Sequence, residues 1–228
     1  MLLRFDEEIW IADGPIARVA GFRYPTRMII IRLTSGALFI WSPIALSDAL
    51  RAAVDRLGPV AHIVAPNALH HRSVGAWRAA YPDAICHAAP GLRARQQDLF
   101  DCDLDDRPAA DWSGEIDQVV VQGNRITTEV VFFHRRSRTM IFTDLIQHFE
   151  PGWFTGWRAL VARLDLMTAP EPTVPRKFRI AFVDRDAARA ALHRILAWPA
   201  EKLLMAHARP ITKDGRAHVV RVFQWLLG

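Results

Sequence analysis

Four side chains able to bind a metal ion follow apolar runs at three separate places in the sequence. The run HIVAPNALHH ends in His70 and His71, TMIFTDL contains Asp144, and KLLMAHARPI contains His207. Imidazole and carboxylate are typical ligands of zinc and non-haem iron, and three or four such groups complete a tetrahedral or open site. The residue types therefore predict a metal site, provided that the fold brings the three places together.

Each of these places reads as a strand followed by a loop. In α/β folds, sites collect at the carboxyl ends of strands, because the loops converge there on one crevice. Around His70 the pattern predicts a β-α-β unit, with strands over VAHIVAP and AICHAAP and a helix over HHRSVGAWRAAY that ends at Pro82. Adjacent residues of a regular helix point about 100° apart, so His70 and His71 bind one ion only at an irregular junction, which is where they lie.

The rest of the chain predicts two groups of strands, each followed by helices. Residues 1–45 read as a β-meander, and Ser47 is placed to cap a helix that ends at Gly58. IDQVVVQG, TEVVFFH and TMIFTDL read as a second sheet. A Trp-rich helix from Pro151, a proline-rich loop, a helix over residues 184–198, the strand KLLMAH and a helix over residues 214–227 follow.

This order predicts an α/β (α+β) fold of two facing sheets with helices on both outer faces, an αββα sandwich. The meander and the later strands should lie in different sheets. A chain of 228 residues with 51% hydrophobic residues can bury one large core, so we expect a single domain over residues 1–228.

Composition limits the partners and the compartment. No apolar run approaches the roughly 20 residues of a membrane helix, and MLLRFDEEIW becomes acidic before a signal-peptide core can form. We therefore expect a cytoplasmic protein without membrane contact, with Cys86 and Cys102 reduced. The net charge of +5 comes from scattered residues, and the one cluster, Arg135, Arg136 and Arg138, falls at a hairpin tip, so no nucleic-acid partner is expected. No dinucleotide-binding G-x-G-x-x-G or Walker loop is present.

The order of hairpins, a strand-loop-helix with histidines, a strand with Asp and a late strand ending in His resembles the metallo-β-lactamase superfamily over nearly the whole chain. More narrowly, PTRMIIIRL, IWSPI, VAPNALHH, EVVFFH, IFTDL and AHARPI are similar to a domain-of-unknown-function family within that superfamily. The resemblance implies the four-layer αββα fold of the metallo-β-lactamase type.

The superfamily signature T-H-x-H-x-D-H can be set on residues 65–71. Pro66 and Ala68 then occupy the positions of its first two histidines, and a further histidine ligand falls near Arg125. The resemblance therefore implies that the first of the two metal sites is lost.

The second site of the superfamily is built from the Asp-His pair, a bridging Asp and a late His. Here these positions are His70, His71, Asp144 and His207. The resemblance implies a site for one divalent metal ion, zinc or iron.

Ordinary structural roles remain open for each of these residues. His71 or Asn67 could cap the following helix, Asp144 could cap a turn, and His207 could be a core histidine bonded to a backbone carbonyl. His148 matches no superfamily ligand and should lie near the site without binding the metal. The other histidines are interpreted as structural or exposed: His62, His87, His134, His193 and His218.

Two hypotheses for the function follow. In the first, the metal activates water to attack an ester, thioester, lactone or phosphoester, Asp144 also orients the water, and Asn67 hydrogen-bonds a substrate oxygen. Trp153, Phe154 and Trp157 either form an apolar wall for a small-molecule substrate or belong to the core. In the second, the chain is a non-catalytic member that binds a small molecule or a partner and has a degenerate site without metal.

Overall fold

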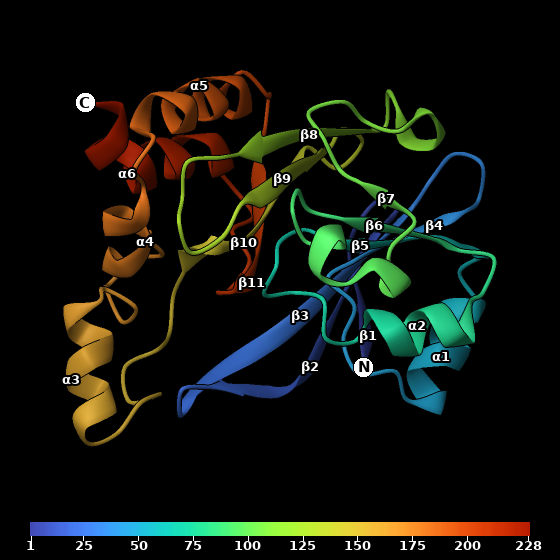
Figure 1. Ribbon diagram of the computed structural model, residues 1–228, viewed down its shortest axis with the longest axis horizontal. Helices are drawn as coiled ribbons and strands as arrows, with labels where there is room; N and C mark the ends of the chain where they lie inside the picture. Colours follow the sequence, from blue (N-terminus) through green and yellow to red (C-terminus); the bar gives the residue numbers. More distant parts are fainter.

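The computed structural model describes residues 1–228 as two facing β-sheets with helices on the outer faces (Figure 1). One sheet has seven strands in the order β1-β2-β3-β4-β5-β6-β7, and the other has four in the order β11-β10-β9-β8. The predicted αββα sandwich is confirmed, and the N-terminal meander and the later strands lie in different sheets as expected.

The first sheet is mixed. Its strands are β1 (Leu2–Asp6), β2 (Ile9–Val19), β3 (Phe22–Arg32), β4 (Leu38–Trp41), β5 (Val60–Ala65), β6 (Ile85–Ala88) and β7 (Cys102–Asp103). Strands β1 to β4 pair antiparallel, whereas β4 to β7 pair parallel. Strand β2 is an 11-residue strand of the predicted meander, and its pairing with β3 shifts register between Gly14 and Ala17.

The second sheet consists of β8 (Ile116–Val121), β9 (Glu129–His134), β10 (Thr139–Gln147) and β11 (Lys202–His207). Strands β8, β9 and β10 pair antiparallel, and β11 pairs parallel to β10. Because β10 and β11 run in the same direction, the residues near their carboxyl ends meet at one edge of the sheet.

The helices are α1 (Asp48–Asp55), α2 (Val74–Ala80), α3 (Trp157–Leu164), α4 (Arg176–Ala181), α5 (Arg185–Leu196) and α6 (Gly215–Leu227). Ser47 caps α1 as predicted, since its hydroxyl accepts the N–H of Leu50. Helix α3 begins later than expected, after Gly156, whose φ of 59° is not helical. Helix α4 was not predicted, and it begins directly after the proline-rich loop, which ends at Pro175.

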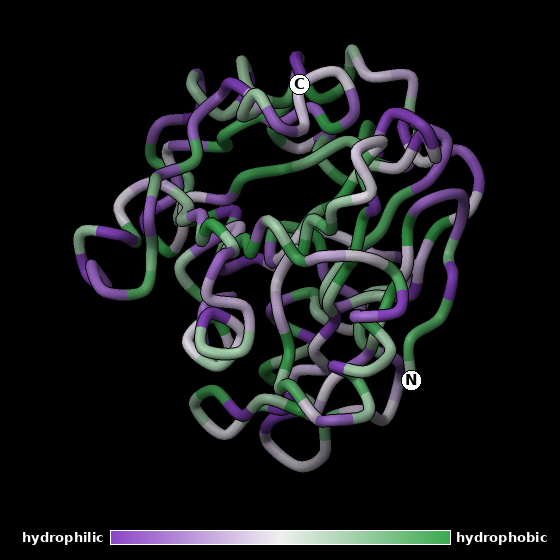
Figure 2. Tube along the Cα trace, turned by 90° about the vertical axis from the view of Figure 1, so that its right-hand side faces the viewer, coloured by the Kyte–Doolittle hydropathy of each residue, from purple (hydrophilic) through white to green (hydrophobic).

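Alternation along the strands separates the core into layers. In β3, Ile29 and Ile31 pack between the sheets, whereas Met28 and Ile30 pack in the cluster that includes residues of α1 and α2. Strand β10 places Ile141 between the sheets, and its neighbours on either side pack in the cluster with α5 and α6. Hydrophobic segments run through the interior, and hydrophilic ones lie mainly at turns (Figure 2). None of the helices has the length and apolar character needed to cross a membrane.

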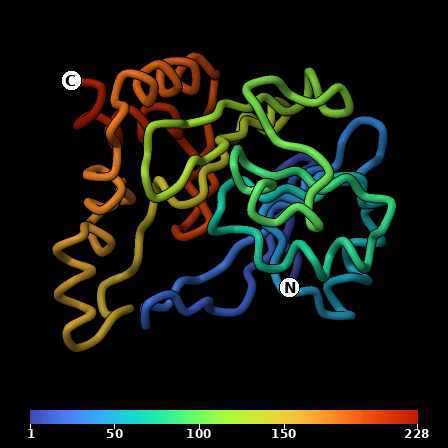
Figure 3. Tube along the Cα trace, viewed as in Figure 1, coloured from blue at the N-terminus to red at the C-terminus, as the bar shows by residue number.

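The hairpin of β2 and β3 extends from the first sheet to the segment that leads into α3 (Figure 3). The ring of Phe22 packs edge-on against Phe154 and Trp157, with centroids 5.4 and 5.7 Å away. The indole N–H of Trp153 donates to the carbonyl of Arg23 over 2.9 Å, and the Arg23 guanidinium donates to the carbonyl of Trp153 over 2.7 Å. The hairpin and the start of α3 are therefore held together as one unit.

Candidate metal centre

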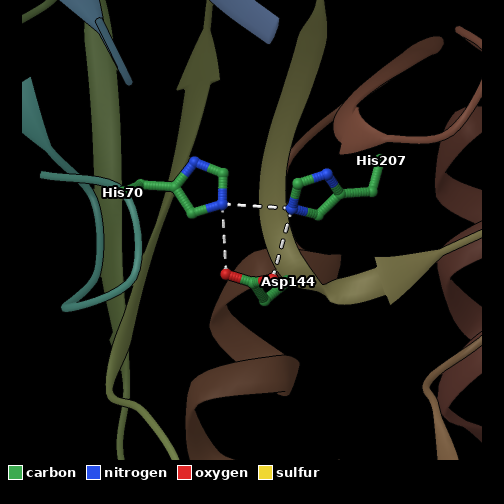
Figure 4. A group of neighbouring side chains, drawn as sticks. All are labelled: His70, Asp144 and His207. Atoms are coloured by element: carbon green, nitrogen blue, oxygen red, sulfur yellow. Dashed lines mark hydrogen bonds and ion pairs between the residues drawn. The ribbon is translucent and has the colours of Figure 1, made fainter. Parts of the chain in front are cut away.

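Three of the predicted ligands converge where the two sheets meet (Figure 4). His70 lies on the loop after β5, Asp144 lies in β10, and His207 is the last residue of β11. Nε2 of His70 is 3.2 Å from Oδ2 of Asp144, Nε2 of His207 is 3.3 Å from Oδ1, and the two Nε2 atoms are 3.2 Å apart. The ligand atoms all lie within 4.8 Å of one another, which suits a shared metal ion.

The outer nitrogen of each imidazole is fixed by a hydrogen bond. Nδ1 of His207 lies 2.7 Å from the carbonyl oxygen of Pro25. Because a carbonyl oxygen only accepts, this nitrogen carries the hydrogen, and the Nε2 of the neutral ring presents a lone pair to the centre. Nδ1 of His70 shares a hydrogen bond of 2.7 Å with the hydroxyl of Ser42. Such outer partners orient a histidine and favour one tautomer.

Ser42 is a site residue that the sequence reasoning missed. It follows β4 directly, is 4% exposed, and its N–H donates to the carbonyl of Val64 in β5. Its φ of 51° lies in the left-handed region, which is rare for a residue other than glycine, asparagine or aspartate. Its position in the sequence, a polar residue at the carboxyl end of a buried strand, is the same signal that indicates His70 and His207.

Asp144 lies at an irregularity of β10, where the register with β11 shifts beyond Phe142. The carboxylate of Glu129 accepts the N–H groups of Thr143, Asp144 and Leu145 over 2.7 to 3.0 Å. These bonds replace the ladder pairing at the bulge. Burial raises the pKa of Glu129 to about 7, and the nearby charge of Asp144 adds to this shift. Nothing in the sequence distinguishes this glutamate from an ordinary first residue of a strand.

The carboxylate of Asp144 is buried among polar side chains. Besides the two imidazoles, Oδ2 accepts the side-chain amide of Asn67 over 2.8 Å, and Oδ1 accepts that of Gln147 over 3.2 Å. Burial alone raises the pKa of this carboxyl, but His70 and His207 together outweigh it and hold the pKa well below the ordinary value. The site therefore contains a fixed negative charge between two imidazoles.

Asn67 holds the site together and does not face the cavity. It is fully buried, and its amide oxygen accepts the backbone N–H groups of Leu69 and His70 while its amide nitrogen donates to Asp144 and Thr143. No polar atom of Asn67 is free for a substrate oxygen, which differs from the role predicted for it. Its contacts make it a positioning residue that ties the loop after β5 to β10.

The structure leaves His71 outside the group of three. Its Nδ1 donates to the carbonyl of Ala68 over 2.8 Å, so the ring turns back on its own loop. The physical reason is the tight turn after Asn67, in which the side chains of adjacent residues diverge. His148 is also outside the group, as predicted, and its backbone N–H donates to the carbonyl of His207.

The family model described as "Domain of unknown function (DUF4336)" matches residues 6–155, which is more than half of the chain. The chain belongs to this family. The narrower resemblance inferred from the sequence motifs is thereby confirmed. No curated protein matches the chain.

Solved structures of similar fold cover nearly all of the chain. The metallo-β-lactamase FIM-1 from Pseudomonas aeruginosa in the mono-zinc form superposes with a TM-score of 0.65 at 12% identity, over 99% of this chain and 94% of that one. The metallo-β-lactamase from Pontibacter korlensis gives 0.64 at 12% identity, over 98% of both chains. The metal-soaked Flv1 flavodiiron core from Synechocystis sp. PCC6803 gives 0.66 at 13%, over 100% of this chain and 60% of that one. This DUF4336 chain therefore has a metallo-β-lactamase-type fold.

The three positions that the sequence resemblance assigned to a first metal site carry no metal-binding side chain. Pro66 is buried and its carbonyl accepts the N–H of Val130, and Ala68 lines the cavity above the site. Arg125 is exposed, and the adjacent Ile126 lines the same cavity. Proline, alanine and arginine side chains offer no ligand atom for a second metal ion at these three positions.

A cavity of about 1150 Å³ opens over His70, Asp144 and His207. Trp153, Phe154 and Trp157 do not line it. Phe154 is buried in a small cluster with Phe149, Ala162 and Met167, while the side chain of Trp157 is 60% exposed. Of the two roles left open for these aromatic residues, Phe154 takes the core role, and the apolar wall of the cavity is formed by other side chains of the β2–β3 hairpin, α3 and α4.

Proposed function

We propose that this DUF4336 chain is a metal-dependent hydrolase that holds one divalent ion, zinc or iron, between His70, Asp144 and His207. The observation that carries the proposal is the convergence of two anchored imidazoles on a buried, ionised carboxylate at the floor of an open cavity. FIM-1, a protein of the same fold, is described in a mono-zinc form, so one zinc ion is compatible with this architecture.

The donor set fits a divalent cation. The two Nε2 atoms face each other at 3.2 Å, an arrangement that needs a shared proton when no cation lies between them. A metal ion replaces that proton and meets two nitrogen lone pairs and a carboxylate oxygen. Three protein ligands leave a coordination position open, as in catalytic zinc sites.

The bound ion supplies a Lewis acid that makes water a nucleophile near neutral pH and polarises a carbonyl or phosphoryl oxygen. The protein holds the reacting groups in place. Ser42 and Pro25 prevent rotation of the imidazoles, and Asn67 and Gln147 fix both carboxylate oxygens of Asp144. The substrate classes compatible with this chemistry are esters, thioesters, lactones and phosphoesters.

A second candidate is a non-catalytic protein that binds a small molecule. It is favoured by Pro66, Ala68 and Arg125, which replace the ligands of the first metal site. Metal-dependent turnover distinguishes the two candidates.

We propose that the protein acts in the cytoplasm on a small-molecule substrate. We propose no nucleic-acid partner for it. The arginines of the β9–β10 turn support this, because Arg135 pairs with Asp117 over 2.7 Å and Arg138 pairs with Glu201 over 2.6 Å. These guanidinium groups are already engaged with carboxylates of the same chain.

The test is turnover of one substrate from each of the four classes by protein loaded with Zn²⁺ or Fe²⁺. Asp144→Asn removes the charge at nearly constant volume and should lower metal-dependent turnover at least a hundredfold. Asp98→Asn is the control, because Asp98 is an exposed aspartate outside both the cavity and the metal group, and this variant should retain turnover. Absence of turnover with all four classes in metal-loaded protein, or equal turnover by Asp144→Asn, contradicts the proposal.

A further inference from the structure

Exposed apolar side chains gather around the cavity above the proposed metal centre. Half of the large hydrophobic residues that are exposed in this chain line this one cavity. On one side they are Ile16 and Val19 of β2, with Leu69 and Ile126 on loops. Single exposed hydrophobic residues are ordinary on a protein surface, but a cluster of them around a concave site marks a binding surface.

The opposite wall comes from the two helices after β10. Val161 and Leu164 of α3 and Ile180 of α4 line the cavity while being 40%, 56% and 74% exposed. Helix α3 lies beside the tip of the β2–β3 hairpin (Figure 1, Figure 3). Side chains from these two distant parts of the chain line the same cavity. Phe22 and Tyr24 of the hairpin continue its lining.

Two of the cationic side chains that line the cavity have no anionic partner. Arg72 and Arg176 line it, and neither guanidinium takes part in an ion pair or a hydrogen bond. By contrast, the ammonium group of Lys177 lies 3.2 Å from Asp165, and Asp144 lies between the two imidazoles. The cationic groups without a partner therefore favour an anionic ligand.

We propose that the cavity binds an anionic single-chain acyl compound, with its hydrocarbon chain along the apolar walls and its negative group near Arg72 or Arg176. This inference rests on the proposed hydrolase and narrows its substrate to a long-chain acyl ester or thioester, whose neutral acyl group becomes the anionic carboxylate on hydrolysis. The volume of about 1150 Å³ exceeds the roughly 300 to 1,000 Å³ of pockets for drug-sized ligands, so there is room for an extended chain.

Calorimetric titration with octanoate, decanoate and dodecanoate, the carboxylate products of such substrates, tests the inference. The ligands are used below their critical micelle concentrations, with metal-free protein in one arm and zinc-loaded protein in the other. We expect one molecule per chain and an affinity that rises about fourfold for each added CH₂ group, equivalent to about 0.8 kcal/mol.

Matched variants locate the binding surface. Leu164→Asp places a charge in the apolar wall and should weaken dodecanoate binding at least tenfold. Leu160→Asp is the control, because Leu160 is on the same helix and is 60% exposed but does not line the cavity. Both positions are exposed, so neither variant removes core packing.

A variant of Arg176 tests whether this guanidinium binds the negative group of the ligand. Arg176→Gln should reduce the preference for decanoate over decan-1-ol about tenfold, whereas Arg163→Gln, on an exposed residue of α3 outside the cavity, should not change it. An affinity independent of chain length, equal effects of Leu164→Asp and Leu160→Asp, or binding only to micelles or vesicles overturns the inference.

Binding to the metal-free protein separates this inference from the proposed hydrolase. If short-chain esters are hydrolysed in a metal-dependent way but affinity ignores chain length, the acyl inference fails and the hydrolase stands. If no metal binds but affinity follows chain length, the hydrolase fails and the acyl-binding cavity stands.

Discussion

Two pairs of histidines in this chain have the same distance between facing ring nitrogens but lie in different surroundings. In the first pair, Nε2 of His70 faces Nε2 of His207 at 3.2 Å, with Asp144 beside both. In the second pair, Nδ1 of His62 and Nε2 of His87 are also 3.2 Å apart. The difference lies in what the remaining nitrogens contact and in what surrounds the rings.

In the second pair, neither ring nitrogen of His87 is free to bind a ligand. Nδ1 of His87 is 3.1 Å from the sulfur of Cys102, and Trp112 packs edge-on against both imidazoles at 4.8 to 4.9 Å. Burial lowers the pKa of His87 to about 4, and neither His62 nor His87 lines the cavity. In the first pair, the outer nitrogens are anchored and the inner ones face a carboxylate and open space. Residues of ligand type form a site only where the fold leaves their donor atoms accessible.

The largest expected difference between the two pairs is their response to zinc. A metal that binds only the folded state stabilises it by RT ln(1 + [L]/Kd), about 4 kcal/mol at a thousand times Kd. His207→Ala should abolish the rise in melting temperature on addition of zinc. His87→Ala should melt at a lower temperature because a buried side chain is lost, yet it should keep the full zinc-induced rise.

Scanning calorimetry at pH 7.5 with zinc, and with chelator, measures both responses. The exposed His193→Ala should behave as the wild type in both conditions. Loss of the zinc response in His87→Ala, or its persistence in His207→Ala, would reverse the assignment of the two pairs.

A smaller difference is expected in acid. The pKa of a histidine in the unfolded chain is about 6.5, whereas burial holds the pKa of His87 at about 4 in the folded protein. Above pH 6.5 both states are neutral and stability is complete. As the pH falls from 6.5 to 4, only the unfolded chain takes up the proton, so up to about 3 kcal/mol of stability is lost.

Urea unfolding of metal-free protein between pH 7 and pH 4 measures this loss. His87→Gln should be less stable at pH 7 and should lose less stability on acidification, whereas His193→Gln should follow the wild type. An unchanged pH slope in His87→Gln is incompatible with a buried neutral imidazole.

The smallest effect concerns the anchors of the first pair. Ser42→Ala removes the hydrogen bond to Nδ1 of His70 and should weaken zinc affinity tenfold to a hundredfold, the range found for such outer partners. Ser137→Ala is the matched control, because its hydroxyl bonds Nδ1 of the remote His134 over 2.8 Å. Competition with a fluorescent chelator measures the affinity, and equal values for the two variants would show that Ser42 does not orient the ligand.

Much of the fold could be predicted because its signals are local. The apolar patterns predicted β5 and β10, and the capping residue Ser47 predicted the start of α1. Helix α4 was missed because it has only six residues directly after a proline-rich loop, and its apolar Phe178 packs on the distant second sheet. Strand β7 has two residues, too few for any period.

The site was predicted less completely, for reasons of geometry. His70 follows β5, Asp144 lies in β10 and His207 ends β11, and residue type, position in the strand pattern and the family resemblance together sufficed to bring them into one predicted site. The choice between His70 and His71 depends on the turn fixed by Asn67, which no spacing rule describes. Pro25 contributes a backbone carbonyl, which leaves no signature in a sequence.

The central claim is that one metal ion lies between His70, Asp144 and His207. A crystal of the zinc-loaded protein, measured at the zinc absorption edge, tests it most directly through the anomalous difference map. We predict one peak per chain, within about 2.0 to 2.2 Å of Nε2 of His70, Nε2 of His207 and a carboxylate oxygen of Asp144. A map with no peak there, or with its peak at His62 and His87, would contradict the account.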